Sequence, residues 1–271
     1  MKIKQVDRET KGHFKIEENG IEAGIMTYTW VGRNVFTIDH TEVKPEYKGR
    51  KFGNQLVMAA VDFAREKNVK ISPICPFVKS IFEKTTEIND VLLMKRKIIA
   101  FAGSNSSKSI NKNLVAYTLK AFAEYSVEFL DLNDFEMPIY SFDREQKDGV
   151  PEKALAFRKH MADSDAIICS LAEHNGNFSA ALKNILDWCS RVDANIFAGK
   201  PMLLMTTSSG RFGGGGVMDI AKKSFKIFGA SIAETFSLPY FNKSFIDNQI
   251  VDVALEAEHS QKIESFKKIL Q

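Results

Sequence analysis

Residues 166–188 read AIICSLAEHNGNFSAALKNILDW, and they place a strand, a turn and a helix in direct succession. The run Ala166–Ser170 is short and almost wholly apolar, which is typical of a strand buried on both faces. An exposed Glu-His-Asn-Gly turn follows at 173–176, and from Ala180 to Cys189 the apolar residues recur at helical spacing. A buried strand that leads into a helix is the unit from which parallel sheets are built.

The same alternation of strand and helix runs through residues 97–271. The pattern predicts strands at 98–102, 127–131, 166–170, 202–206 and 231–236. It predicts helices at 114–122, 153–161, 180–189, 216–228 and 253–269. Strands in this order favour an α/β fold, a flavodoxin-like doubly wound parallel sheet of five strands with helices on both faces.

The preceding residues show a different pattern. Alternating segments at 13–18, 21–30 and 35–43, the first two joined by Asn19-Gly20, predict an antiparallel meander. A helix at 54–67, a strand at 69–74 and a helix at 77–84 follow. We therefore predict two domains, an α+β domain at 1–94 and the flavodoxin-like domain at 97–271, joined by a short linker.

The composition is that of an ordinary globular protein, with 44% apolar and 26% charged residues. A net charge of +3 gives no reason to expect a nucleic-acid or membrane partner. Three scattered cysteines are too few for a disulfide framework or a zinc site, and they fit a reducing cytoplasm. We expect neither a signal peptide nor a membrane span.

Ligands of a doubly wound sheet bind beyond the carboxyl ends of its strands. The first such end carries GSNSSKSINK at 103–112, where a glycine, several hydroxyls and a helix N-terminus would surround an anion. The loop has neither a Walker lysine pattern nor G-x-G-x-x-G. The alternative is a polar loop that only caps a helix.

Two further strand ends would form the other walls of the same crevice. One is the turn at 173–176, and the other is the stretch TSSGRFGGGG at 207–216. Consecutive glycines allow a ligand to approach the backbone closely. The alternative for this glycine run is a flexible loop that contacts nothing.

These segments resemble the NADPH-dependent FMN reductase family, which also includes azoreductases and quinone reductases. The family signature T-P-E-Y-N-x-x-x-P-x-x-L-K-N-x-x-D-W is matched at Glu173, Asn175, Leu182, Lys183, Asn184, Asp187 and Trp188. The family loop G-S-x-R-x-x-S-x-N is matched at Gly103, Ser104, Ser109 and Asn111. Pro138-Ile139-Tyr140, after Asp131-Leu132, is similar to the family's D-L…P-x-Y stretch.

The resemblance implies a bound FMN that takes electrons from NADPH or NADH and passes them to a small acceptor such as a quinone or free flavin. It implies FMN contacts at Gly103, Ser104, Ser106, Ser109, Asn111, Glu173, His174, Asn175, Gly176, Ser208 and Gly210. It also implies a homodimer or homotetramer formed through this domain. The rival hypotheses are a non-enzymatic electron carrier and a redox sensor that regulates the N-terminal domain.

Departures from the family pattern concern charge and ring contacts. Ser106 stands where the family has arginine, so the phosphate would rely on hydroxyls, amides and Lys108. His174 replaces a tyrosine, and it would stack on the flavin or transfer a proton. Arg211 would contact the phosphate of NADPH or remain a solvated loop residue. We interpret Lys183, Asn184 and Asp187 as structural.

Residues 42–56 combine a strand end, a basic glycine loop and a helix, and they resemble the Q/R-x-x-G-x-G/A loop of GNAT acetyltransferases. A small branch of that superfamily shares the His-Thr-Glu-Val at 40–43 and the Cys-Pro-Phe at 75–77. The resemblance implies acetyl-CoA contacts at Gly49, Arg50, Gly53 and Asn54, although Lys51 occupies the first glycine position of the motif.

The same resemblance implies catalytic candidates in the N-terminal domain. Cys75 would be a nucleophile or acid near the acetyl group, and His40, with Glu42, would be a general base. The alternatives are a small buried residue at a strand end for Cys75, and strand residues that face solvent for His40 and Glu42.

Overall fold

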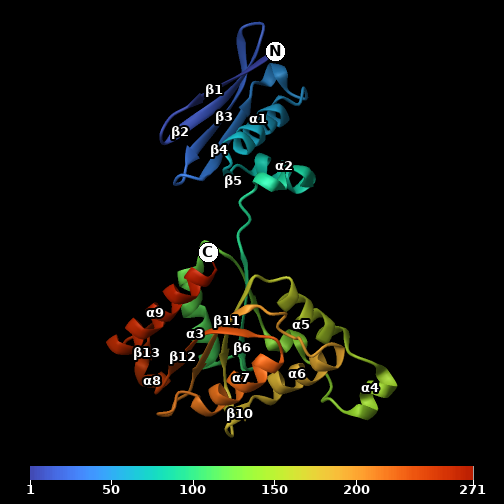
Figure 1. The fold of residues 1–271 in the computed structure, drawn as a ribbon, viewed down its shortest axis with the longest axis vertical. Helices are drawn as coiled ribbons and strands as arrows, with labels where there is room; N and C mark the ends of the chain where they lie inside the picture. The colour runs from blue at the N-terminus through green and yellow to red at the C-terminus, as the bar shows by residue number, and fades with distance from the viewer. Residues whose placement is uncertain (271) are drawn as a thin grey trace. The chain divides into compact units, whose positions relative to one another are not determined.

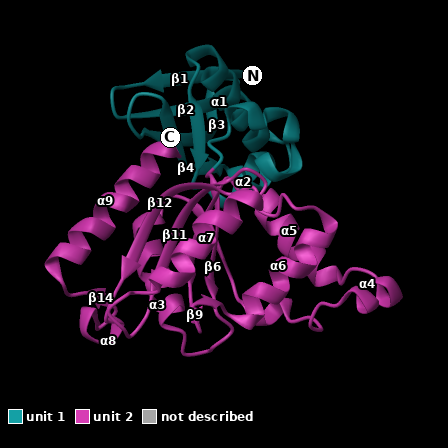
Figure 2. Cartoon of the chain, turned by 60° about the horizontal axis from the view of Figure 1, so that its bottom comes forward, with its two compact units in different colours: residues 1–94 teal, residues 95–271 magenta. Residues whose placement is uncertain are grey.

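The computed structural model describes residues 1–270 and divides the chain into two compact units, Met1–Met94 and Lys95–Gln271 (Figure 2). We call them the N-terminal unit and the C-terminal unit, and each is described by itself.

A five-stranded parallel sheet forms the centre of the C-terminal unit (Figure 1). Its strands are β6 (Lys97–Gly103), β7 (Ser126–Leu130), β8 (Ala166–Leu171), β11 (Pro201–Thr207) and β12 (Ser231–Leu238). They lie in the order β12-β11-β8-β6-β7, and all neighbouring pairs are parallel. This is the flavodoxin-like order, so the predicted fold class is confirmed.

Helices cover both faces of this sheet. One core packs against α5 (Glu152–Ala162), α6 (Ala180–Val192) and α7 (Gly215–Ile227), and the other against α3 (Ile110–Leu119) and α9 (Val253–Ile269). In β6, Ile99 and Phe101 belong to the first core, whereas Ile98 and Ala100 belong to the second. Burial on both faces explains why this strand has a continuous apolar sequence.

Several short elements of the C-terminal unit were not predicted. They are α4 (Phe142–Asp148), α8 (Phe241–Ser244), β9 (Glu173–His174), β10 (Asn177–Phe178), β13 (Phe245–Ile246), β14 (Gln249–Ile250) and the 3-10 turns η3 (Lys120–Phe122) and η4 (Leu132–Phe135). Each is too short to produce a hydrophobic period, and for this reason sequence patterns do not reveal them.

The N-terminal unit is a mixed sheet in the order β1-β2-β3-β4-β5. Its strands are β1 (Lys2–Asp7), β2 (Lys11–Glu18), β3 (Ile21–Trp30), β4 (Val35–Val43) and β5 (Lys70–Pro73), and its helices are α1 (Phe52–Lys67) and α2 (Pro76–Lys84), with 3-10 turns η1 (Pro45–Tyr47) and η2 (Thr86–Val91). Strands β2, β3 and β4 form the predicted antiparallel meander, β1 is antiparallel to β2, and β5 runs parallel to β4.

Strand β1 was missed because Ile3 is its one apolar side chain packed against the core, while its other contacts with the core are polar. Gln5 Nε2 donates to the hydroxyl of the buried Tyr28 at 3.0 Å, and that hydroxyl donates to Asp7 Oδ1 at 2.8 Å. Burial raises the pKa of Tyr28 above its usual range. A strand that offers an amide and a carboxylate to the core lacks the apolar alternation on which prediction depends.

The described helices include none that is both long and apolar enough to cross a lipid bilayer. All three cysteines are free and buried, and burial raises the pKa of Cys189 to about 12.

His259 is a buried ionisable group in the last helix, α9. Its Nε2 lies 2.8 Å from Thr118 Oγ1, and its Nδ1 has no hydrogen-bond partner among residues 1–270. The ring stacks on Tyr117. Loss of hydration lowers the pKa of His259, and nearby Glu256 offsets this only in part. The folded state therefore holds a neutral imidazole.

We expect His259 to make the stability of the C-terminal unit depend on pH. Above pH ~6.5, the usual histidine pKa, the side chain is neutral in both states. Below it the unfolded chain gains a proton that the folded unit resists, so stability falls as the pH drops towards the lowered folded-state pKa. Urea unfolding between pH 7 and pH 5, followed by Trp188 fluorescence in a Trp30→Phe background, measures this.

His259→Leu should flatten the pH dependence, because Thr118 keeps its hydrogen bond to the Leu114 carbonyl. His174→Asn, at an exposed position of the same unit, is the control and should leave the slope unchanged. Equal slopes in the wild type and His259→Leu would contradict the prediction.

Candidate functional site

Loops after β6, β8 and β11 meet at one edge of the C-terminal sheet, because the carboxyl ends of parallel strands lie together. We call residues 104–109 the serine loop, β9 and β10 with their turn the hairpin, and residues 208–214 the glycine loop. These segments carry all the FMN contacts predicted from sequence except Gly103 and Asn111, which flank the serine loop.

Asn111 holds this edge together from the first turn of α3. Its side chain is buried, and its Oδ1 accepts hydrogen bonds from Ser170 Oγ at 2.6 Å and from the backbone N–H of Thr207 at 3.2 Å. Its Nδ2 donates to the Thr207 carbonyl at 3.4 Å. One amide therefore ties the end of β8 and the end of β11 to α3.

Ser170 and Thr207 were not predicted as site residues. The signal that would have revealed them is a hydroxyl residue at the end of an otherwise apolar buried strand, since a buried polar group needs a partner.

The serine loop is shaped by its own hydroxyls. Ser104 Oγ accepts from the N–H of Ser106, and Ser106 Oγ accepts from the N–H of Lys108, both at 3.2 Å. Ser109 Oγ accepts from Lys112 N–H at 3.3 Å and caps α3. A hydroxyl that accepts a hydrogen bond keeps its own hydrogen to donate, so the loop can still offer O–H donors to an anion.

Gly103 lets this loop leave β6 close to its neighbours. A Cβ at this position would lie 3.0 Å from Leu171 Cδ2 and 3.1 Å from Leu182 Cδ2. A larger side chain would push the loop away from β8 and α6.

Positive charge at the serine loop is sparse. Lys112 Nζ lies 2.5 Å from Asp131 Oδ2, and this contact lowers the pKa of Asp131. Lys108 forms no ion pair with any described residue. Because Ser106 carries no charge, Lys108 is the cation of the loop that is left for an anionic ligand.

The hairpin is closed by a tight turn. Asn175 and Gly176 have φ values of 53° and 73°, the left-handed geometry of a type I′ turn, and His174 pairs with Asn177. His174 is exposed.

Glu173 connects the hairpin to α7. Its Oε2 accepts a hydrogen bond from the N–H of Val217 at 3.0 Å, in the first turn of the helix, where a carboxylate is favoured. A Cβ at Gly216 would lie 3.1–3.2 Å from that carboxylate. Glycine at 216 therefore leaves room for the Glu173 contact.

The glycine loop packs against the ends of the strands. It therefore differs from the alternative expected from the sequence, a flexible loop that contacts nothing. Gly213 has φ 57°, and a Cβ there would lie 2.5 Å from Ser237 Oγ and 2.9 Å from the nitrogen of Pro239. Gly214 has φ 86°, and its Cβ would lie 2.9 Å from the Cβ of Thr206. Both positions require glycine for conformation and for space.

Asn184 and Trp188 of α6 hold the segment 137–140. Asn184 Oδ1 accepts from Tyr140 N–H at 2.8 Å, and its Nδ2 donates to the carbonyls of Met137 and Pro138. Trp188 Nε1 donates to the Pro138 carbonyl at 2.7 Å. These polar residues of the helix, which match the family signature, thus act by positioning a neighbouring loop.

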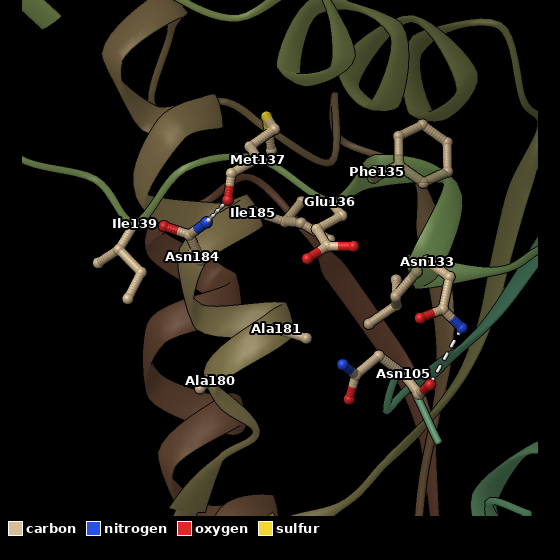
Figure 3. Close-up of a pocket in the computed structure, with 11 residues that line it drawn as sticks. Asn105, Asn133, Phe135, Glu136, Met137, Ile139, Ala180, Ala181, Asn184 and Ile185 are labelled. Carbon is tan, nitrogen blue, oxygen red and sulfur yellow. Dashed lines mark hydrogen bonds between the residues drawn. The ribbon is translucent and has the colours of Figure 1, made fainter. Parts of the chain in front are cut away.

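A pocket of about 180 Å³ opens between the serine loop, the segment 132–139 and the start of α6 (Figure 3). Asn133 Nδ2 closes one side by donating to the Asn105 carbonyl at 3.0 Å, and the Glu136 carboxylate points into the space. Ala180 and Ala181 line it with small side chains. The predicted FMN contacts lie on the surrounding loops, outside the lining of this pocket. Asn105 and Asn133 were missed by sequence reasoning.

In the N-terminal unit, β4 and β5 pair only as far as Ile38 and Pro73. The N–H groups of Ile74 and Cys75 both donate to the Ile38 carbonyl at 3.0 Å, while β4 continues to Val43 beside β3. Two parallel strands therefore separate beyond this point.

A pocket of about 460 Å³ lies where β4 continues and α1 begins. Its lining includes Thr41, Lys48, Gly49, Lys51, Gly53, Asn54 and Phe77. Thr41 Oγ1 is buried and has no hydrogen-bond partner among the described residues. Three predicted acetyl-CoA contacts, Gly49, Gly53 and Asn54, are thus brought together.

The other candidates of this unit are placed elsewhere. Arg50 donates two hydrogen bonds of 2.6 Å to Glu18, so its charge is already paired. Cys75 is buried at the start of α2, and His40 is exposed with its Nε2 3.9 Å from Glu42 Oε2. None of these residues lines the pocket.

Comparison with known proteins identifies the C-terminal unit. Residues 96–243, more than half of the chain, match the family described as NADPH-dependent FMN reductase. This chain belongs to that family. The FMN reductase match confirms the resemblance carried by the serine loop and by α6.

Curated relatives of this FMN reductase family member include a quinone reductase of Escherichia coli, 33% identical over 44% of this chain. A 2-hydroxy-1,4-benzoquinone reductase of Burkholderia is 36% identical over 44% of the chain. The chain spans 64% of the length of each of these relatives.

The N-terminal unit also has relatives. Residues 13–91 match the family described as GCN5-related N-acetyl-transferase, which confirms the predicted resemblance. A GCN5-like protein of Staphylococcus aureus, solved by NMR, is 38% identical over 34% of this chain and 87% of its own, with a TM-score of 0.27.

The described residues fit an FMN at the shared edge. The serine loop places its hydroxyls before the N-terminus of α3, and Gly210 of the glycine loop has nearly open space around its α-carbon. The poor fit is confined to Ser106, which lacks the charge of the family's arginine.

We expect Gly216→Ala to disrupt the contact between Glu173 and Val217. The added Cβ would displace the carboxylate, so Gly216→Ala should be about 0.5–2 kcal/mol less stable than Gly215→Ala, which gains the same helix propensity. The measurement is the free energy of urea unfolding of the C-terminal unit.

Gly215→Ala is the matched control, because no atom lies within 4 Å of a Cβ at that position. It should be neutral or stabilise the unit by up to ~1 kcal/mol, since alanine favours helix. Equal effects of the two substitutions would contradict the role assigned to Glu173.

Proposed function

We propose that the C-terminal unit binds FMN and uses it to carry electrons from NADPH or NADH to a small acceptor. The observation that supports this most strongly is the bracing of the shared edge: Asn111 and Glu173 join three loops whose backbone and hydroxyl groups suit a flavin phosphate and ring. Family membership supports the same conclusion.

In this proposal the serine loop holds the FMN phosphate. The hydroxyls of Ser104, Ser106 and Ser109 donate to it, and Lys108 adds charge beside the N-terminus of α3. Gly103 keeps the loop close to β8. Asn111 acts by fixing the edge, since its amide is already engaged.

The flavin ring would lie between the hairpin and the glycine loop. Asn175, Gly176, Ser208 and Gly210 offer backbone and hydroxyl groups to its polar edge, and Glu173 positions the hairpin against α7. His174 packs on the ring. FMN, when bound, supplies the hydride-accepting chemistry, and the protein's part is to hold two rings together and keep water out.

The names of the relatives favour a quinone as acceptor, with free flavin as the alternative. Exposed Ile139 and Phe142, at the base of the protruding α4, offer apolar surface for a homodimer formed through this unit (Figure 1). Three buried free thiols fit the reducing cytoplasm.

Purified protein mixed with FMN should show the visible absorbance of oxidised flavin, and NADPH should bleach it. Steady NADPH oxidation with a quinone would then distinguish a reductase from a simple electron carrier. A protein that stays colourless after reconstitution with FMN would refute the proposal.

The Ser106→Arg variant sharpens this experiment. A guanidinium would give the phosphate a bidentate charged partner, so we expect the FMN dissociation constant to fall about tenfold or more. Riboflavin, which lacks the phosphate, is the control and should bind both proteins equally. Tightening of both ligands would show that position 106 does not face the phosphate.

A second candidate function is acetyl transfer by the N-terminal unit. It is favoured by the separation of β4 and β5 beside a pocket that contains the unpartnered Thr41 hydroxyl. Acetyl-CoA would lie in this pocket, with its pyrophosphate at Gly49, Gly53, Asn54 and the start of α1. Arg50 is paired with Glu18, so its positive charge is not free for the pyrophosphate. Lys48 and Lys51 form no ion pair with a described residue, and they supply the positive charge instead. Cys75 and His40 remain proposed catalytic residues.

Calorimetric titration of the full chain with CoA tests this site. Lys48→Ala combined with Lys51→Ala should weaken CoA binding about tenfold, and added salt should weaken the wild type, because the attraction is between exposed charges. Lys67→Ala, at the opposite end of α1, should bind normally. Absence of CoA binding at millimolar concentration would reject the site.

A further inference from the structure

Two cations and two aromatic rings form an exposed rim, one pair within the glycine loop and the other in the segment that follows β12. We call Arg211, Phe212, Tyr240 and Lys243 the rim cluster. The Arg211 guanidinium lies 4.4 Å from the centre of the Phe212 ring, and Lys243 Nζ lies 5.8 Å from the centre of the Tyr240 ring. Phe212 is 69% exposed and Tyr240 45% exposed.

Backbone hydrogen bonds hold the two halves of this cluster side by side. Tyr240 N–H donates to the Gly210 carbonyl, and Phe241 N–H donates to the Ser208 carbonyl, both at 3.0 Å. Lys243 follows one turn later, and its N–H donates to the Tyr240 carbonyl at 2.7 Å. The loops after β11 and β12 are therefore joined, and the rim continues directly from Ser208 and Gly210.

The backbone at Tyr240 adopts a conformation that residues other than glycine rarely take. Its φ is 50°, in the left-handed region, although the residue carries a large ring. Left-handed residues of this kind concentrate at ligand-binding sites. Tyr240 precedes α8, and its ring is partly exposed.

The charges of the rim cluster are not neutralised within the protein. Among residues 1–270, neither Arg211 nor Lys243 forms an ion pair, whereas Lys262 on the neighbouring α9 is paired with Glu234 at 2.9 Å. Each rim cation contacts an aromatic face instead. The cluster thus combines unpaired positive charge with exposed flat apolar surface.

We propose that the rim cluster binds the phosphorylated adenosine of the hydride donor and makes the protein prefer NADPH to NADH. This inference rests on the proposed flavin site, since the donor's nicotinamide must reach the ring near Gly210. Phe212 and Tyr240 provide faces for the adenine, as aromatic rings do for flat ligands. Arg211 and Lys243 contact the 2′-phosphate, the group that distinguishes NADPH from NADH.

The test compares both donors on the flavin-loaded protein. Arg211→Ala combined with Lys243→Ala should raise the KM for NADPH at least tenfold, change the KM for NADH less than threefold, and leave kcat with either donor unchanged. Lys147→Ala, on the protruding α4, is the control substitution and should alter neither KM.

A binding measurement gives a readout that is independent of turnover. Calorimetry with 2′,5′-ADP and with 5′-ADP should show tighter binding of 2′,5′-ADP to the wild type, and this difference should vanish in the double variant. Equal weakening for both donors would place the cations on the diphosphate and overturn the inference, as would no change for either.

Failure of this inference can be told apart from failure of the proposed function. If the flavin spectrum and its bleaching by NADH are normal but the rim variants show no NADPH-specific effect, only the inference fails. If no flavin binds, the proposed function fails, and preferential 2′,5′-ADP binding to the flavin-free protein still decides whether the rim cluster recognises the phosphate.

Discussion

The buried side-chain amide of Asn111 fixes one edge of the sheet in the C-terminal unit, the edge at which the carboxyl ends of the strands meet. It accepts hydrogen bonds from Ser170 at 2.6 Å and from Thr207 at 3.2 Å, and so it fixes β8 and β11 against α3. A buried amide without these partners would leave polar groups unsatisfied, which costs about 1–3 kcal/mol for each group. The serine loop leads into α3, and the glycine loop begins at the end of β11, so the spacing of the two loops depends on this amide.

The residues that match the family signature are mostly structural. Asn184 and Trp188 hold the segment 137–140, Glu173 holds the start of α7, and Lys183 forms a surface pair with Asp187 at 2.6 Å. None of these contacts requires proton transfer. This fits a reaction in which the cofactor supplies the chemistry and the protein supplies orientation and a dry site.

In two of the proposed ligand sites, an acidic residue of the protein neutralises part of the positive charge. Lys112 is paired with Asp131 at the serine loop, and Arg50 is paired with Glu18 in the N-terminal unit. The cations left for ligands are Lys108, the rim cluster's Arg211 and Lys243, and Lys48 with Lys51. Counting basic residues in a loop therefore overstates its attraction for phosphate, because partners distant in sequence neutralise part of the charge.

The sequence by itself determined the fold and predicted where the site of the C-terminal unit would lie. Buried strands such as Ala166–Leu171 have an unmistakable apolar run, and parallel strands always bring their carboxyl ends to one edge. Strand β1 was hidden because Gln5 and Asp7 meet a buried tyrosine hydroxyl, which leaves no apolar period. Only the tertiary structure decided which hydrogen-bond partners the polar residues of that site have. Asn111 was predicted to contact FMN, and the structure adds that its amide binds residues 59 and 96 positions away in the chain. Hydrogen-bond partners separated so far are chosen by packing, and no local pattern records them.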